Sequence, residues 1–134
     1  MNNQFEEFKV WKKSHSLVLI VYKITKKFPQ DEKYSLTDQL KRAVVSIAAN
    51  TAEGNTRYSK NEFIHFMYIA KSSLEEVKYY LLLARDLDYI SVKEYEEMQK
   101  TSTEVGKLIN GFIRYLKLRR NIKYDQGIIL KSKV

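Results

Sequence analysis

Cysteine is absent from this sequence of 134 residues, which excludes disulfide bonds, thiolate nucleophiles and cysteine-ligated zinc within it. One proline and four glycines leave few positions at which a helix would break. No window approaches about 18 consecutive apolar residues, and the first residues lack the layout of a signal peptide. We therefore expect a protein of the reducing cytoplasm that neither spans a membrane nor is exported.

Apolar residues recur every three or four positions along most of the chain, and the strict alternation typical of β-strands is missing. A length of 134 residues suits one domain that buries roughly two thirds of its unfolded surface. We therefore predict an all-α fold, with one helical domain over residues 1–120. Residues 121–134 lack helical periodicity and form a basic C-terminal tail, whose apolar run 127–130 belongs either to a disordered segment or to a docking strand.

The most informative stretch is residues 34–54, which carries the signals of a complete helix. Ser35 and Asp38 have the spacing of a capping box, and Gly54 is expected to end the helix in the left-handed conformation. Small alanines in its second half predict that the helix packs closely against its neighbours. Its predicted core row consists of Leu36, Leu40, Val44, Ile47 and Thr51.

Three further helices are predicted over residues 8–27, 59–90 and 91–120, and the last two begin with capping boxes at Ser59 and Ser91. The connections between the four helices are short, so that neighbours must run antiparallel in an up-down-up-down four-helix bundle. The predicted core rows of the three helices are Trp11, Ser14, Val18, Val21, Thr25 and Phe28; Phe63, Met67, Ala70, Leu74, Val77, Leu81 and Ala84; and Met98, Ser102, Val105, Ile109, Phe112 and Leu116.

Two of these helices carry more apolar surface than a single bundle needs. In the first helix a second apolar stripe, formed by Leu17, Ile20 and Ile24, lies beside the core row. In the third helix Phe66 and Tyr80 belong to a second, partly apolar face. We expect these five residues to be buried between the subunits of a homo-oligomer.

The chain is basic, with 24 Lys and Arg against 16 Asp and Glu and a formal charge of +8. This balance favours an acidic partner, with nucleic acid as the leading candidate and an anionic membrane surface as the second. The last helix also has cations every seven residues, at Lys93, Lys100, Lys107 and Arg114. The candidate nucleic-acid contacts are Lys12, Lys13, Lys23, Lys26, Lys27, Arg42, Lys107, Arg114, Lys117, Arg119 and Arg120. In a monomer such ridges are equally well explained as solvated faces, whereas a ring would multiply them.

The sequence offers little for catalysis. Its two histidines, His15 and His65, lie on different predicted helices without the spacing of a helical zinc site, and the glycines form no phosphate loop. Asn50 and Glu53 are polar residues on a helix rich in alanine, for which capping or interhelical bonding is the preferred interpretation. We therefore predict neither enzyme activity, nor a metal, nor a cofactor, and keep a hydrolase or nuclease that uses Glu53 as a much weaker hypothesis.

Several short pieces carry a resemblance to a known family. With these pieces in the family's order, residues 5–118 resemble the four-helix-bundle proteins encoded by intervening sequences in bacterial large-subunit ribosomal RNA genes. The sequence is also similar to accessory proteins of diversity-generating retroelements, whose basic barrels bind nucleic acid and a reverse transcriptase. The resemblance implies an antiparallel bundle that forms a homopentameric ring and has no enzyme activity. The pieces are Val10-Trp11-Lys12, Phe28-Pro29 with Glu32 and Tyr34, residues 39–47 and 50–54, Arg57 with Ser59, and Ser73-Leu74 with Glu76.

From these observations we expect a cytoplasmic, non-enzymatic homo-oligomer that binds nucleic acid, with structured RNA as the leading ligand, through Lys and Arg contacts to phosphate. The alternative is a protein adaptor whose tyrosine-rich faces and tail recruit another protein, such as a reverse transcriptase-like enzyme. Tyr115 and Tyr124 lie near Arg119 and Arg120, where they either stack on unpaired bases or pack in an interface.

Overall fold

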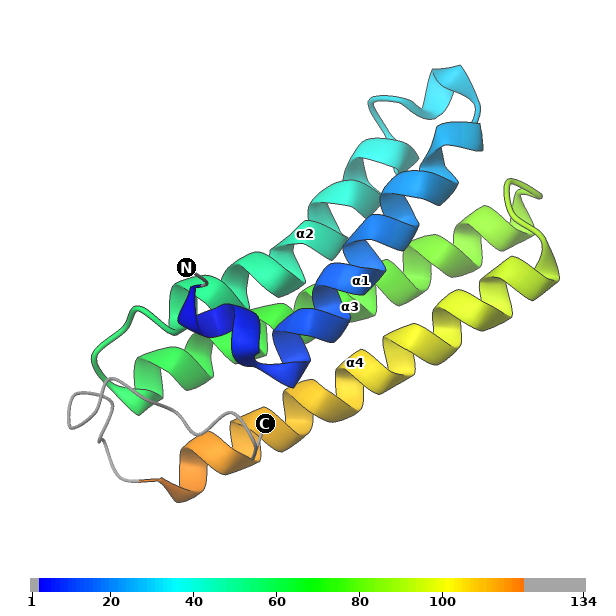
Figure 1. Ribbon diagram of the computed structural model, residues 1–134. Coiled ribbons are helices and arrows are strands. Elements are labelled where there is room, and N and C mark those ends of the chain that lie inside the picture. Colours follow the sequence, from blue (N-terminus) through cyan, green and yellow to red (C-terminus); the bar gives the residue numbers. More distant parts are fainter. Residues whose placement is uncertain (1–2, 120–134) are drawn as a thin grey trace.

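A computed structural model describes residues 3–119 and contains four α-helices: α1 (Lys9–Ile24), α2 (Leu36–Gly54), α3 (Lys60–Asp86) and α4 (Val92–Leu118). Short 3-10 turns precede α1 (η1, Gln4–Glu7) and follow it (η2, Thr25–Lys27, and η3, Gln30–Glu32). Consecutive helices run in opposite directions, and the described residues contain no strand (Figure 1). The predicted all-α four-helix bundle is thereby confirmed.

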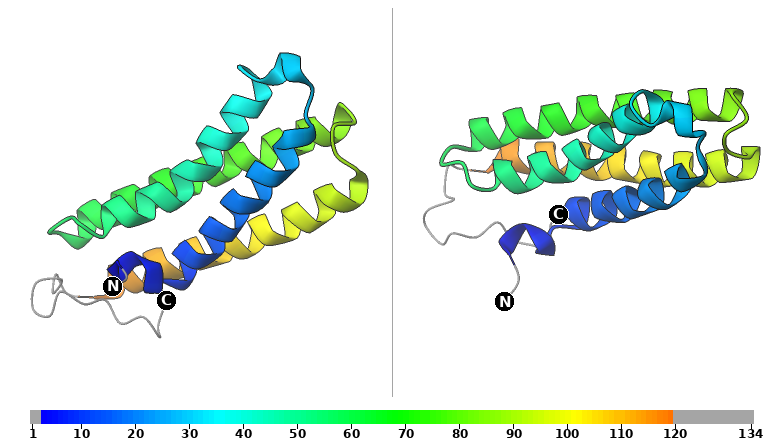
Figure 2. Two further views of the ribbon diagram at one scale, coloured as in Figure 1. Left: turned by 45° about the horizontal axis from the view of Figure 1, so that its top comes forward. Right: turned by 90° about the horizontal axis from the view of Figure 1, so that it is seen from above.

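The core is built from one apolar row of each helix. Every residue of the rows predicted for α2, α3 and α4 is buried. One end of the core holds three aromatic rings, from the junction of η1 and α1, from α3 and from α4, with centroids 5.2 Å apart for Phe8 and Phe112 and 5.1 Å apart for Phe63 and Phe112. These contacts bring η1 and the C-terminal end of α4 to the same end of the bundle (Figure 2).

The predicted register of α1 is wrong in part. Leu17 is fully buried in the core, whereas Trp11 and Val18 are only half-buried at its edge. The buried residues of α1 are Val10, Ser14, Leu17 and Val21, which follow the helical period. With this row facing the core, the Trp11 side chain lies to one side of the row. Leu17 therefore has no exposed surface with which to contact another subunit.

Polar residues on the core rows bond within their own helices. The hydroxyl groups of Ser14, Thr51 and Ser102 each donate to the carbonyl oxygen four residues earlier, over 2.7, 3.0 and 2.8 Å respectively. A buried hydroxyl that lacks a partner destabilises a fold, and these back-bonds remove that cost. Hydroxyl groups thus line the core without requiring a polar partner on another helix.

The helix starts follow the capping signals at two of three sites. The Ser59 and Ser91 side chains accept from the backbone N–H of Glu62 and Glu94. The predicted cap of α2 is wrong, because Ser35 makes no side-chain capping bond. Glu32 takes this place: its carboxylate accepts from the Leu36 N–H and the Ser35 and Tyr89 hydroxyl groups, and these bonds lower the pKa of Glu32.

Gly54 does not end α2 in the left-handed conformation. It is the last helical residue, and Asn55 after it has φ −64° and ψ −19°, in the right-handed region. Gly54 is buried where α2 meets α3, against Phe63 and Phe66. The glycine is required by the close approach of the two helices and not by the turn.

Candidate nucleic-acid interface

Three of the predicted phosphate contacts lie in salt bridges within the bundle. Lys13 and Lys27 on the α1 side pair with Glu104 and Glu94 of α4, at 3.0 and 2.5 Å, and Arg42 pairs with Asp38 one turn earlier on α2, at 2.9 Å. An ammonium or guanidinium group already paired with a carboxylate gains less from a phosphate, because the existing pair must first be broken. These three residues are consequently the weaker candidates.

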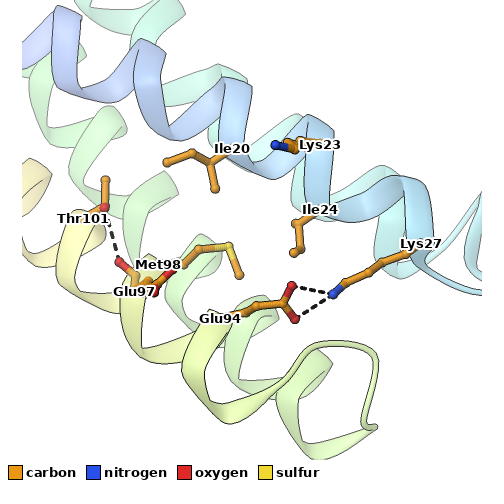
Figure 3. A pocket seen from close by; sticks show the side chains of 8 residues that line it. All are labelled: Ile20, Lys23, Ile24, Lys27, Glu94, Glu97, Met98 and Thr101. Carbon is orange, nitrogen blue, oxygen red and sulfur yellow. Dashed lines mark hydrogen bonds and ion pairs between the residues drawn. The ribbon is translucent and has the colours of Figure 1, made fainter.

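The Lys27–Glu94 pair lies at one end of a groove of about 530 Å³ between α1 and α4. Ile20 and Ile24 point into this groove from α1, and Met98 points into it from α4 (Figure 3). Both oxygens of the Glu94 carboxylate accept from the Lys27 ammonium, at 2.6 and 2.5 Å, which lowers the pKa of Glu94, and the Ser91 N–H acts in the same direction. The groove thus has an apolar floor and is bounded at one end by the Lys27–Glu94 ion pair.

Three of the predicted cations lie on the solvent side of the first segment. Lys12, Lys23 and Lys26 are exposed. Among the acids of residues 3–119, a carboxylate lies in reach of Lys12 alone, with 4.0 Å between its Nζ and Glu7. Lys23 also lines the rim of the α1–α4 groove. These residues form a basic surface along α1 and η2 that reaches the α1–α4 groove at Lys23.

The outer side of α4 carries a row of exposed cations. Lys93, Lys100, Lys107 and Arg114 are all exposed on it. Residues 105–119 contain four cations and no Asp or Glu, so that the C-terminal half of α4 has no acid of its own to neutralise it. Lys107 and Arg114 make no salt bridge with any described residue. The ammonium group of Lys107 and the guanidinium group of Arg114 therefore remain available to an external anion.

Lys117 extends this surface toward α3. Its ammonium donates to the Tyr68 hydroxyl over 3.0 Å and lies 5.5 Å from the centroid of the same ring. This bond and the charge of Lys117 lower the pKa of Tyr68, and the charge of Lys71 on α3 adds to the effect. Lys71, Tyr68 and Lys117 therefore form one exposed basic and aromatic group at the end where α4 terminates.

Arg119 is placed differently from the other cations of α4. Its guanidinium group bonds to the Tyr115 hydroxyl and lies 5.0 Å from the centroid of that ring, which also packs against Phe112. Tyr115 is thus engaged within the bundle, which favours packing over base stacking for this residue. Arg120 and Tyr124 lie outside the described residues.

At the seam between α2 and α3, polar residues of the segments that resemble the family form hydrogen bonds. The Ser46 and Ser73 hydroxyl groups share a hydrogen bond of 2.8 Å, and the Asn50 amide donates to the Ser46 carbonyl and hydroxyl oxygens. Glu53 is exposed and accepts from the Arg57 guanidinium over 2.7 Å. Helix packing and an ion pair therefore account for the contacts of Asn50 and Glu53.

The predicted subunit contacts lie on two different faces. Ile20 is 38% exposed and Ile24 half-buried in the α1–α4 groove, whereas Phe66 and Tyr80 are half-buried near the α2–α3 seam. The guanidinium of Arg57 covers the Phe66 ring at 4.6 Å, and Tyr80 donates to the Gln39 side chain. Of the five residues predicted to contact another subunit, all except Leu17 therefore keep some exposed surface.

An exposed apolar group on α1 and α2 was missed by the sequence reasoning. Leu19 is 58% exposed, and Tyr22 and Val45 are 42% and 38% exposed. The signal was present in the sequence: placing Leu17 in the core leaves Leu19 and Ile20 toward solvent. Leu19, Tyr22 and Val45 are therefore further candidates for a subunit contact. The wrong register predicted for α1 did not reveal them.

Both histidines contact an aromatic ring. His15 is exposed and stacks on Trp11 at 4.7 Å, and His65 lies edge-on to Phe66. Within residues 3–119, no group of three His, Asp or Glu side chains is arranged to hold a metal ion. In the same part of the chain, no helix combines the length and apolar character needed to cross a bilayer.

Known proteins place the chain in a family. The profile of the 23S rRNA-intervening sequence protein family matches residues 6–111. A crystal structure from Bacteroides thetaiotaomicron, described as a protein of unknown function from the S23 ribosomal protein family, is similar at 29% identity. The likeness covers 78% of this chain and 98% of that one, with a TM-score of 0.73. No curated protein matches the sequence. With more than two thirds of its residues inside the match, the chain belongs to the 23S rRNA-intervening sequence protein family.

Proposed function

We propose that this protein is a non-enzymatic, cytoplasmic homo-oligomer that binds nucleic acid, with structured RNA as the expected ligand. The observation that carries the proposal is the acid-free C-terminal half of α4, on which Lys107, Arg114 and Lys117 are exposed. Phosphate contacts of this kind supply most sequence-independent affinity for nucleic acids. The Tyr68 hydroxyl and Lys71 ammonium lie beside Lys117 and widen the surface offered to a phosphate backbone.

Self-association strengthens the proposed binding. A closed ring brings several copies of the basic surface to one nucleic acid, so that contacts that are weak singly add up to a stable complex. A heterologous ring contact needs two different surfaces on each subunit. This chain offers the exposed side chains of Leu19 and Ile20 on α1 and the half-buried side chains of Phe66 and Tyr80 near the α2–α3 seam. A pentamer is the state that the family resemblance implies.

The test is binding of a labelled hairpin RNA across a salt series, with duplex DNA of equal length as the comparison. We expect affinity to fall steeply with salt, because each phosphate contact releases a counterion. A preference for RNA over DNA would indicate recognition of A-form shape or of unpaired nucleotides. Absence of binding even at low salt would contradict the proposal and favour the adaptor hypothesis, which a pull-down of protein partners would then test.

A further inference from the structure

Gly111 lies in the middle of the exposed side of α4, where its lack of a side chain leaves a hollow of about 340 Å³. Glycine inside a helix is unfavourable relative to alanine, because it gives up more backbone freedom on folding. A helix therefore keeps a central glycine at a net loss unless a close contact or a ligand requires it.

Among the described residues, no close contact requires glycine at position 111. A Cβ on residue 111 would meet only the end of the Arg114 side chain, 3.9 Å away. The other two described glycines differ: a Cβ on Gly106 would lie 3.3 Å from the Leu74 side chain, and Gly54 is packed still more tightly against Phe63. Contacts among the described residues thus explain Gly54 and Gly106 but give no reason for glycine at position 111.

The walls of the hollow have two kinds of chemistry. Leu108, Tyr115 and Leu118 give it apolar sides, and Leu118 is 83% exposed. Lys107 and Arg114 stand on either side of Gly111 and are exposed. Seven residues separate these cations, which places their backbones about 10.5 Å apart along the helix.

We infer that the hollow over Gly111 binds one unpaired nucleotide of a single-stranded segment. The flat face of the base covers Gly111 and the neighbouring leucines, while Lys107 and Arg114 hold the phosphates on its two sides. A duplex offers the same phosphates but keeps the faces of its bases stacked inside, so that only single strands use the apolar part of the site. This inference rests on the proposed function and specifies its ligand as unpaired nucleotides.

The test fills the hollow without touching either cation. Gly111→Ala and Gly111→Leu are compared with wild type, and Thr103→Ala is the matched control, because Thr103 is exposed on the same helix but does not line the hollow. The probes are a labelled single-stranded oligouridylate, an abasic ribose-phosphate strand of the same length, and duplex RNA. Thermal melting by circular dichroism monitors the fold, and light scattering monitors the particle mass.

We expect Gly111→Leu to weaken oligouridylate binding roughly tenfold, because the added side chain takes the place of the base on the apolar surface, and Gly111→Ala to weaken it less. Affinity for the abasic strand and the duplex stays unchanged, and Thr103→Ala binds all probes as wild type does. Gly111→Ala also raises the melting temperature, which separates the loss of binding from a loss of stability.

Other outcomes overturn the inference in different ways. If wild type and Gly111→Leu bind oligouridylate equally, or wild type binds the abasic strand as well as oligouridylate, the hollow holds no base, while salt-dependent binding leaves the proposed function intact. If Gly111→Leu changes the particle mass and weakens all probes alike, the hollow is a subunit contact. If wild type binds none of the probes at low salt, the proposed function fails together with the inference.

Discussion

Gly54 at the end of α2 lies so close to Phe63 on α3 that a Cβ on residue 54 would be 2.6 Å from Cδ1 of the Phe63 ring. The same atom would lie 3.0 Å from the Phe66 Cβ. Phe63 is itself wedged against Phe8 and Phe112, so its ring has little room to retreat. The contact fixes how closely α2 and α3 approach at this end of the bundle.

We predict that Gly54→Ala lowers the free energy of unfolding by about 1–3 kcal/mol, the usual cost of overpacking a core. The better helix propensity of alanine offsets part of this loss. Urea denaturation followed by circular dichroism measures the change. Gly111→Ala is the matched control and is expected to raise stability by up to about 1 kcal/mol. Equal effects of the two substitutions would contradict this account of Gly54.

Charge reversal distinguishes the basic surface of α4 from that of α1. The triple variant Lys107→Glu, Arg114→Glu and Lys117→Glu is expected to weaken RNA binding and to flatten its salt dependence, because three phosphate contacts are lost. The matched control reverses Lys12, Lys23 and Lys26, which changes the net charge by the same amount on exposed positions. Binding by filter retention and helicity by circular dichroism are measured for both. An equal loss in the two variants would mean that net charge, and not the α4 surface, governs binding.

The Lys27–Glu94 pair predicts a pH-dependent contribution to stability. Because the pair lowers the folded-state pKa of Glu94 from its ordinary value of 4.5, its contribution is complete above that value and is lost as the pH falls toward the folded-state pKa. Both side chains are partly exposed, so we expect a contribution of at most about 1 kcal/mol.

Glu94→Gln is the variant that isolates this pair, since glutamine keeps a side chain able to complete the capping box with Ser91. The variant is expected to be less stable than wild type at pH 7 and to match it once the pH is well below 4.5, as measured by urea denaturation at each pH. A stability difference that persists at low pH would assign the effect to the cap and not to the ion pair.

The exposed apolar surface of α1 predicts self-association. We expect Leu19→Asp with Ile20→Asp to reduce the particle mass in multi-angle light scattering, because buried carboxylates at a subunit contact are unfavourable. Leu87→Asp with Val92→Asp is the control, since these residues are also exposed but lie near the α3–α4 connection. If wild type is monomeric at tens of micromolar, or if both variants behave alike, these surfaces do not form the contact.

Much of the fold could be predicted from the sequence because its determinants are local. The core rows of α2, α3 and α4 follow a single apolar period, so one helix face is specified without reference to the rest of the chain. The α1 helix carries two apolar rows, and the choice between Leu17 and Trp11 for the core depends on how the other three helices pack around it. The helix was therefore predicted correctly while its register was not.

The sequence by itself determined four amphipathic helices, their order and an excess of positive charge. Only the tertiary structure decided which cations remain available to a ligand, because Coulomb attraction at the surface is screened beyond about 8 Å at physiological ionic strength and the partners are distant in sequence. Lys13 meets Glu104 and Lys27 meets Glu94 only after α1 and α4 lie side by side, whereas Lys107 and Arg114 have no acid on their half of α4. Folding thus separates the basic residues into two groups. Some pair with carboxylates and join the helices, and others form a surface that is accessible to phosphate.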